Sequence, residues 1–242
     1  MSDSPMNQWQ EEDSEAFVDY GRYFVPDRAA QLQTICDLIP PRFEPFRVLE
    51  LCCGEGLLAE AILQQYASAS VEGLDGSAVM LARAQARLAG FNGRFHLRPF
   101  DLAAPEWRTG TPAYHAVVSS LTIHHLDAAE KQQLFADVYQ MLVPGGVFII
   151  ADVIQPVGQF GTAVAAGAWD TAVQQQALAL DGNLDAYDVF VQKEWNLFRY
   201  PDPLDKPSPL LDQLLWLREA DLTAVDIHWL YAGHAIFSGR KL

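Results

Sequence analysis

The stretch Val48-Leu-Glu-Leu-Cys-Cys-Gly-Glu-Gly56 decides the fold of this chain. It begins with apolar residues interrupted only by Glu50, as is typical of a short buried strand. The residues after Leu51 are mostly small, which predicts a tight turn, and an apolar helical pattern over 57–67 follows. Small residues in such a turn let backbone N–H groups and a helix N-terminus approach a ligand closely. We therefore expect a β-turn-α unit with a ligand site at its turn.

A second acid strengthens this expectation. Asp75 follows an apolar strand predicted over 70–74 and stands 25 residues beyond Glu50. A carboxylate at the end of the next strand can accept hydrogen bonds from both hydroxyls of a ribose. The turn at 52–56 and Asp75 together indicate an adenosine ligand.

Strands alternate with helices on both sides of this unit. Apolar strands are expected over 47–51, 70–74, 95–98, 116–120 and 147–151, with helices over 57–67, 77–90 and 127–142. A helix over 210–220 and two strands over 224–231 and 235–239, joined around Gly233, follow near the C-terminus. Nearly all-apolar strands are typical of a parallel sheet covered on both faces. The predicted fold class is α/β, with a doubly wound, seven-stranded, mostly parallel sheet and a terminal antiparallel hairpin.

Several of these motifs, in this order, resemble the class I, Rossmann-like S-adenosylmethionine-dependent methyltransferases. Their first motif usually reads Asp/Glu-x-Gly-x-Gly-x-Gly; Glu50, Gly54 and Gly56 match it, and Cys52 replaces the first glycine. The resemblance is strongest over residues 45–152. A dehydrogenase is disfavoured because Gly-x-Gly-x-x-Gly is absent from the first turn.

The resemblance implies S-adenosylmethionine as methyl donor and S-adenosylhomocysteine as product. It places Asp75 at the ribose, Asp101 and Leu102 near the adenine, and Arg28 near the methionine carboxylate. The full set of expected cofactor-binding residues is Tyr23, Arg28, Glu50, Cys52, Cys53, Gly54, Gly56, Asp75, Gly76, Met80, Asp101, Leu102 and Ser119.

His124 and His125 are the candidate catalytic residues. They follow the fourth predicted strand, where the resembling enzymes place residues that face the acceptor, and one could act as a general base on an acceptor hydroxyl. The alternative is a packing role, since similar histidine pairs occur in members of very different specificity. A sulfonium methyl is already activated, so positioning can supply most of the catalysis and no metal site is predicted.

The composition narrows the partners. The formal net charge is −15, which repels phosphate backbones and anionic lipid surfaces, so neither nucleic acid nor a membrane is expected as a partner. No run of 18 apolar residues occurs, and Cys36, Cys52 and Cys53 match neither a disulfide framework nor a paired metal-ligand pattern. A reducing cytoplasm fits best. A homodimer is left open.

We expect two segments along the chain. Residues 1–44 form a polar tail, over 1–15, and a helical gate with a helix over 27–39; residues 45–242 form the methyltransferase domain. Within that domain, 155–208 is an inserted cover with a helix over 162–180. Its aromatic residues could line an acceptor pocket or anchor the cover; they are Trp169, Trp195, Phe198 and Tyr200.

The expected function is methylation of a small molecule, with an oxygen acceptor as the first choice. Two alternatives stay open at this point. One is an enzyme that modifies S-adenosylmethionine itself, and the other is a non-catalytic module that binds the cofactor.

Overall fold

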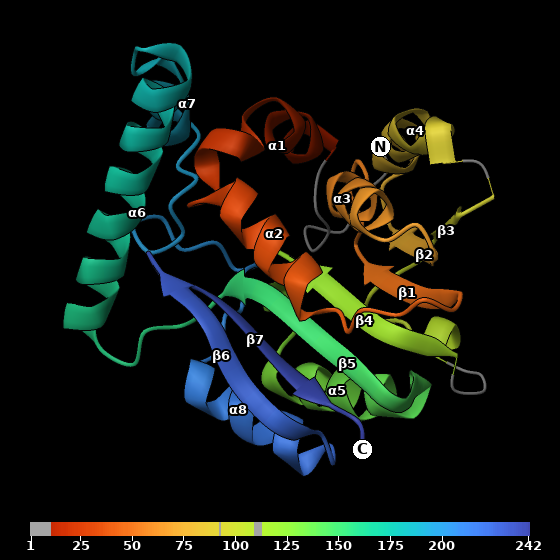
Figure 1. Cartoon of the computed structure of the whole chain (residues 1–242). Helices are drawn as coiled ribbons and strands as arrows, with labels where there is room; N and C mark the ends of the chain where they lie inside the picture. Colours follow the sequence, from red (N-terminus) through yellow and green to blue (C-terminus); the bar gives the residue numbers. More distant parts are fainter. Residues whose placement is uncertain (1–10, 92, 109–112) are drawn as a thin grey trace, which may run out of the picture.

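The computed structural model describes residues 11–91, 93–108 and 113–242. One seven-stranded sheet with the order β3-β2-β1-β4-β5-β7-β6 forms its centre (Figure 1). The strands are β1 Phe46–Leu51, β2 Ala69–Asp75, β3 Phe95–Pro99, β4 Tyr114–Ser120, β5 Leu142–Val153, β6 Thr223–Tyr231 and β7 His234–Arg240. The first five run parallel, and β7 pairs antiparallel with both β5 and β6. The predicted fold class is confirmed.

Helices cover both faces of the sheet. They are α1 Glu11–Phe24, α2 Arg28–Leu38, α3 Leu57–Gln65, α4 Ala78–Arg87, α5 Ala128–Met141, α6 Gln159–Asp181, α7 Asp185–Gln192 and α8 Leu210–Glu219, with short 3-10 turns at Leu88–Phe91, Glu106–Arg108 and Ile123–His125. In Figure 1, α5 and α8 lie on one face, and α2 and α3 lie on the other. Among the described residues, no helix is long and apolar enough to cross a membrane.

The two faces of β1 show why this sheet needs cover on both sides. Successive side chains of a strand point to opposite faces. Leu49 and Leu51 join the apolar cluster that contains residues of α5 and α8, whereas Phe46 and Val48 join the cluster that contains residues of α2 and α3. Glu50 is in step with Phe46 and Val48 and so faces α2 and α3.

Capping residues fix where two helices begin. Asp127 and Glu130 form a reciprocal capping box at the start of α5, as the sequence predicts. Ser77 caps α4 by accepting a hydrogen bond from the backbone N–H of Met80. Both caps start a helix directly beyond the carboxyl edge of the sheet.

Three expectations were wrong in detail. Residues 11–15 of the predicted tail belong to α1, while residues 1–10 lie outside the described residues. Helix α7 was not predicted, and β5 begins at Leu142, so the predicted turn over 143–146 lies within it. The backbone N–H of Gly145 donates to the carbonyl of Lys241, so pairing with the distant C-terminus extends this segment.

The predicted helical insertion after β5 is confirmed, and it packs against the N-terminal helix. The indole N–H of Trp169 in α6 donates to the carbonyl of Phe24 at 2.7 Å. The amide of Gln176 donates to the carbonyls of Tyr23 and Val25 at 2.7 and 3.0 Å. Of the two roles considered for Trp169, the structure shows anchoring. In Figure 1, α6 and α7 lie to the left of the sheet, and α1 lies next to them above α2.

The β6–β7 hairpin turns at Gly233, whose φ is +75°. A Cβ at this position would lie 2.2 Å from the Phe198 ring, so a side chain meets both a strained backbone and a packed ring. The hairpin thus depends on glycine, and it carries His234 to the edge where the parallel strands end.

We expect Gly233→Ala to lower the free energy of unfolding by roughly 2–4 kcal/mol, because the left-handed backbone and the displaced ring both cost energy. Gly167→Ala is the matched control, since Gly167 lies inside α6 with open space around it and should gain about 0.5–1 kcal/mol. Urea denaturation of both variants tests this. Equal stabilities would contradict the assigned constraint.

Candidate functional site

The candidate site lies at the carboxyl edge of the parallel strands. The turn at 52–56 follows β1, Asp75 ends β2, Ser120 ends β4, and Asp152 lies near the end of β5. Strand order reverses between β1 and β4, which pair directly in the sheet. In open α/β sheets a ligand crevice forms at such a reversal, outside the carboxyl ends of the strands.

The turn after β1 has an unusual backbone. Cys52, Gly54 and Gly56 all have positive φ, at 52°, 53° and 82°. Cys52 therefore adopts a left-handed conformation with a side chain, at a cost of about 1–2 kcal/mol. A Cβ on Gly54 would meet no atom within 4 Å, so the turn faces open space there. Its backbone is accessible to a ligand.

Asp75 ties this turn to α4. Its Oδ2 accepts from the backbone N–H of Gly54 at 2.7 Å, and its Oδ1 accepts from the backbone N–H of Ser77 at 2.9 Å. Asp75 is buried. The carboxylate is thereby held beside the open face of the turn.

Cys53 and Gly56 hold the turn from behind. The backbone N–H of Cys53 donates to the carbonyl of Leu74 at 2.9 Å, and its side chain is buried against Gly73. A Cβ on Gly56 would lie 3.2 Å from the Cβ of Ala84 in α4. These contacts make α4 and β2 the support of the turn.

Two buried polar atoms beside the turn have no hydrogen-bond partner among the described residues. They are Oε2 of Glu50 and Oγ of Ser119, which belong to the paired strands β1 and β4. Buried polar atoms normally find partners, so these two atoms mark a place where a polar group of a ligand could supply the missing hydrogen bonds. Both residues are among the predicted cofactor-binding residues.

Burial raises the pKa of Glu50 to about 8, although the nearby Arg28 guanidinium acts in the opposite direction. Burial also lowers the pKa of Arg28 to about 10. Arg28 donates to Oγ of Ser120 at 2.6 Å, so α2 is tied to the end of β4. A cationic ligand group near Glu50 would favour its ionised form.

The remaining predicted cofactor residues lie at two places. Near the ends of β2 and β3, Met80 is buried, Leu102 packs on the core, and the exposed Asp101 accepts from the N–H of Ala103 at 2.9 Å. A Cβ on Gly76 would lie 3.3 Å from the carbonyl oxygen of Phe100. The residues that follow β2 and β3 are therefore close together here.

Tyr23 lies elsewhere. Its hydroxyl donates to Oδ2 of Asp181 at 2.5 Å and accepts from Arg22. Among the described residues it makes no hydrogen bond with the turn at 52–56. Tyr23 therefore joins α1 to the end of α6.

His124 and Asp152 form a buried pair at the other end of the edge. Oδ1 of Asp152 lies 2.6 Å from Nδ1 of His124, and Oδ2 accepts from the backbone N–H of His124 at 2.8 Å. Burial opposes a charge on His124, yet the Asp152 carboxylate outweighs it and raises the pKa of His124. Burial likewise opposes the charge on Asp152, but His124 and the N–H of Val153 lower its pKa.

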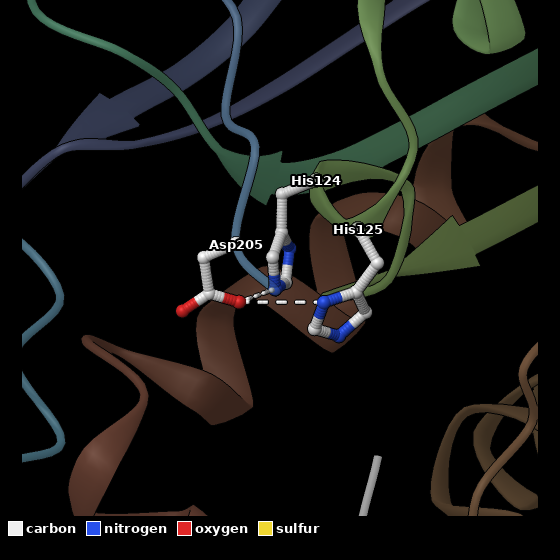
Figure 2. Close-up of side chains that lie close together, drawn as sticks. All are labelled: His124, His125 and Asp205. Atoms are coloured by element: carbon white, nitrogen blue, oxygen red, sulfur yellow. Dashed lines mark ion pairs between the residues drawn. The ribbon is translucent and has the colours of Figure 1, made fainter. Parts of the chain in front are cut away.

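Three residues that the sequence did not select contribute to this end of the edge. Asp152 carried a usable signal, an acid near the end of an apolar strand, as with Glu50 and Asp75. Asp205, on the segment before α8, carried none, and its Oδ1 lies 3.5 Å from Nε2 of His124 (Figure 2). His234 is buried 4.6 Å from the Trp169 ring, and burial lowers its pKa to about 4.

Comparison with known proteins identifies the class of protein that this chain is similar to. Residues 48–146 match a family model described as a methyltransferase domain. An uncharacterised methyltransferase from Synechocystis sp. is 29% identical over 110 residues, covering 46% of this chain and 48% of the relative. A trans-aconitate 2-methyltransferase from Streptomyces avermitilis is 37% identical over 90 residues, covering 35% and 32%. This chain therefore aligns with half or less of the length of these two relatives.

Among solved structures, an O-methyltransferase family 2 protein from Planctomyces limnophilus, in complex with apigenin, superposes with a TM-score of 0.62. Its identity is 18%, and the match covers 98% of this chain and 63% of that chain. At this identity the match shows a shared fold alone.

Glu50 should make stability fall as the pH rises. Between its ordinary pKa of 4.5 and its folded value of about 8, the folded protein binds a proton that the unfolded chain releases. The free energy of unfolding should therefore drop through this window by on the order of a few kcal/mol. Glu50→Gln should remove the drop, because glutamine does not titrate.

Urea denaturation at about pH 5 and about pH 8.5 measures the effect. The exposed Glu44 supplies the control, and Glu44→Gln should keep the wild-type pH dependence. A Glu50→Gln profile parallel to that of the wild type would show that the carboxyl is not desolvated.

Proposed function

We propose that this chain is a class I S-adenosylmethionine-dependent methyltransferase that methylates an oxygen of a small molecule, since its residues 48–146 match a methyltransferase domain. The observation that carries the proposal is the paired arrangement of the carboxyl edge. One end offers an open turn with unsatisfied polar atoms, and the other end offers a histidine oriented by a buried carboxylate.

The residues at the first end fit S-adenosylmethionine. Its sulfonium and ammonium groups are cations, and the buried Glu50 has an unpartnered oxygen beside the turn. When bound, the cofactor supplies a methyl group that its positively charged sulfur has already activated. Cys52, Cys53, Gly54 and Gly56 would provide backbone contacts.

Other residues complete this assignment. Asp75 would accept from the ribose hydroxyls, Gly76 and Met80 would border the ribose and adenine, and Asp101 with Leu102 would contact the adenine. Arg28 would bind the methionine carboxylate from α2, and Ser119 would hydrogen-bond beside Glu50. Tyr23 would act from a distance, by holding α1 against α6 as part of the gate.

His124 would serve as the general base. Because the Nδ1–H of its neutral ring donates to Asp152, Nε2 is left to accept a proton. When bound, S-adenosylmethionine would supply the methyl group that the acceptor oxygen takes up, and its sulfur would keep the bonding electron pair. The hydroxyl proton passes to Nε2 of His124, and Asp152 stabilises the resulting imidazolium. His125 would border the acceptor beside it.

The acceptor and the setting follow from charge and composition. A net charge of −15 disfavours nucleic acid and anionic membranes as partners, which leaves a small molecule. Three free cysteines fit a reducing cytoplasm. We keep residues 1–44 as the gate and 45–242 as the catalytic domain, with 155–208 as the cover over the acceptor. A homodimer is compatible with this function but not required by it.

Asp75→Ala should weaken the affinity for S-adenosylhomocysteine by on the order of 1–3 kcal/mol, because ligand hydroxyls lose their acceptor and the turn loses its tie to α4. Isothermal titration calorimetry measures the change. Asp226→Ala on the exposed face of the edge strand β6 should leave the affinity unchanged. Retained affinity in Asp75→Ala would count against the ribose contact.

The function itself is tested by incubating the protein with methyl-labelled S-adenosylmethionine and a panel of hydroxylated small molecules. We expect label in one class of acceptor. His124→Gln should lower kcat by about 100-fold or more while leaving cofactor affinity intact. Cofactor binding without any transfer would favour a binding module, and a chemically altered cofactor without an acceptor would favour modification of S-adenosylmethionine itself.

A further inference from the structure

Three side chains that can ligate a metal converge beyond the end of β4. His124, His125 and Asp205 each offer one ligand atom, and these atoms all lie within 4.8 Å of one another (Figure 2). Oδ1 of Asp205 lies 3.5 Å from Nε2 of His124 and 3.3 Å from Nδ1 of His125. The two histidines are neighbours in the sequence, but Asp205 comes from the segment after the cover helices.

These separations suit a metal ion. Imidazole nitrogen and carboxylate oxygen bind zinc at about 2.0–2.2 Å, and two such ligands at a tetrahedral angle lie roughly 3.3–3.5 Å apart. Both distances to Asp205 fall in this range. Two imidazoles and one carboxylate are a donor set for divalent first-row metals, and they leave coordination positions open.

A second observation supports the site independently. Ligating histidines usually donate their other ring N–H to a carboxylate, which fixes the tautomer and aims the ligating nitrogen. Asp152 does this for His124: it holds Nδ1 at 2.6 Å, so Nε2 faces Asp205. Asp152 is itself fixed, since it accepts from the backbone N–H groups of His124 and Val153.

The third ligand is also held in place without an ion. The backbone N–H of Lys206 donates to the carbonyl of His124 at 2.7 Å. The buried Lys131 donates to the carbonyl of Lys206 and, at 2.9 Å, to Oγ of Ser208. Asp205 thus lies on a segment that is hydrogen-bonded to the turn that carries His124 and His125.

We propose that His124, His125 and Asp205 bind one divalent transition-metal ion of the zinc type. The consequence for catalysis rests on the proposed function: the ion would ligate the acceptor oxygen and lower the pKa of its hydroxyl. The hydroxyl proton then leaves to solvent, because the ion occupies the lone pair of His124 that otherwise accepts it. The acceptor class is a small molecule whose reacting oxygen can ligate a metal.

The test uses the full chain, stripped with EDTA and titrated with Zn²⁺ by calorimetry. We expect one ion per chain in the wild type. Asp205→Asn and His125→Gln should each weaken binding by about tenfold or more. Asp202→Asn is the matched control, since it changes an exposed carboxylate on the same segment and should bind Zn²⁺ like the wild type. Circular dichroism confirms that each variant is folded.

Co²⁺ loading gives a spectroscopic readout, because tetrahedral nitrogen and oxygen ligands produce visible bands that should disappear in Asp205→Asn. A wild type that binds no ion, or variants that bind as tightly as the control, would overturn the site. Calorimetry of the stripped protein with S-adenosylhomocysteine separates the two proposals: retained cofactor binding without ion binding removes the metal site and leaves the methyltransferase assignment standing.

Discussion

The structure depends on how buried acids are satisfied at the carboxyl edge of the parallel sheet. Glu50, Asp75 and Asp152 are all buried there, at 3%, 7% and 2% exposure, so each needs compensation. Asp75 takes it from backbone N–H groups of the turn and of α4. Asp152 is compensated by His124, whereas Oε2 of Glu50 has no hydrogen-bond partner among the described residues. Asp75 and Asp152 are therefore held by hydrogen bonds, whereas Glu50, on a strand between them, keeps one oxygen without a partner in the part of the chain that the structure describes. A cationic cofactor could compensate that oxygen.

Helix α1 of the N-terminal gate packs against helices α6 and α7 of the cover. Phe24 packs against Phe190 and Trp195 at 5.2 Å between ring centroids, and the side-chain amide of Gln176 donates to the carbonyls of Arg22, Tyr23 and Val25. Because Arg28 follows these residues and reaches Ser120, the cover sets the position of a residue at the cofactor end.

The two ends of the edge share β4, and this links the proposed functions. Ser119 lies near the end of β4 at the proposed cofactor site. The chain then turns at Leu121, whose φ is +60°, and reaches His124 five residues after Ser119. In the proposed reaction, Nε2 of His124 is the atom that acts on the acceptor. Whether a proton or a metal ion occupies that nitrogen, Asp152 fixes its direction. The proposed methyl transfer would then depend on the position of His124, which the buried Asp152 fixes through its side chain and backbone contacts.

The sequence by itself determined the fold class, the glycine turn and the acids at strand ends, because apolar periodicity and small residues act locally. It also located the caps at Ser77 and Asp127. The structure shows that residues 11–15 belong to α1, whose last residues Tyr23 and Phe24 pack with aromatic residues of α6 and α7. Tertiary structure alone brought Tyr23 to Asp181, 158 positions away, and Asp205 to the histidines. Such contacts depend on where the cover folds back, and no local spacing encodes them.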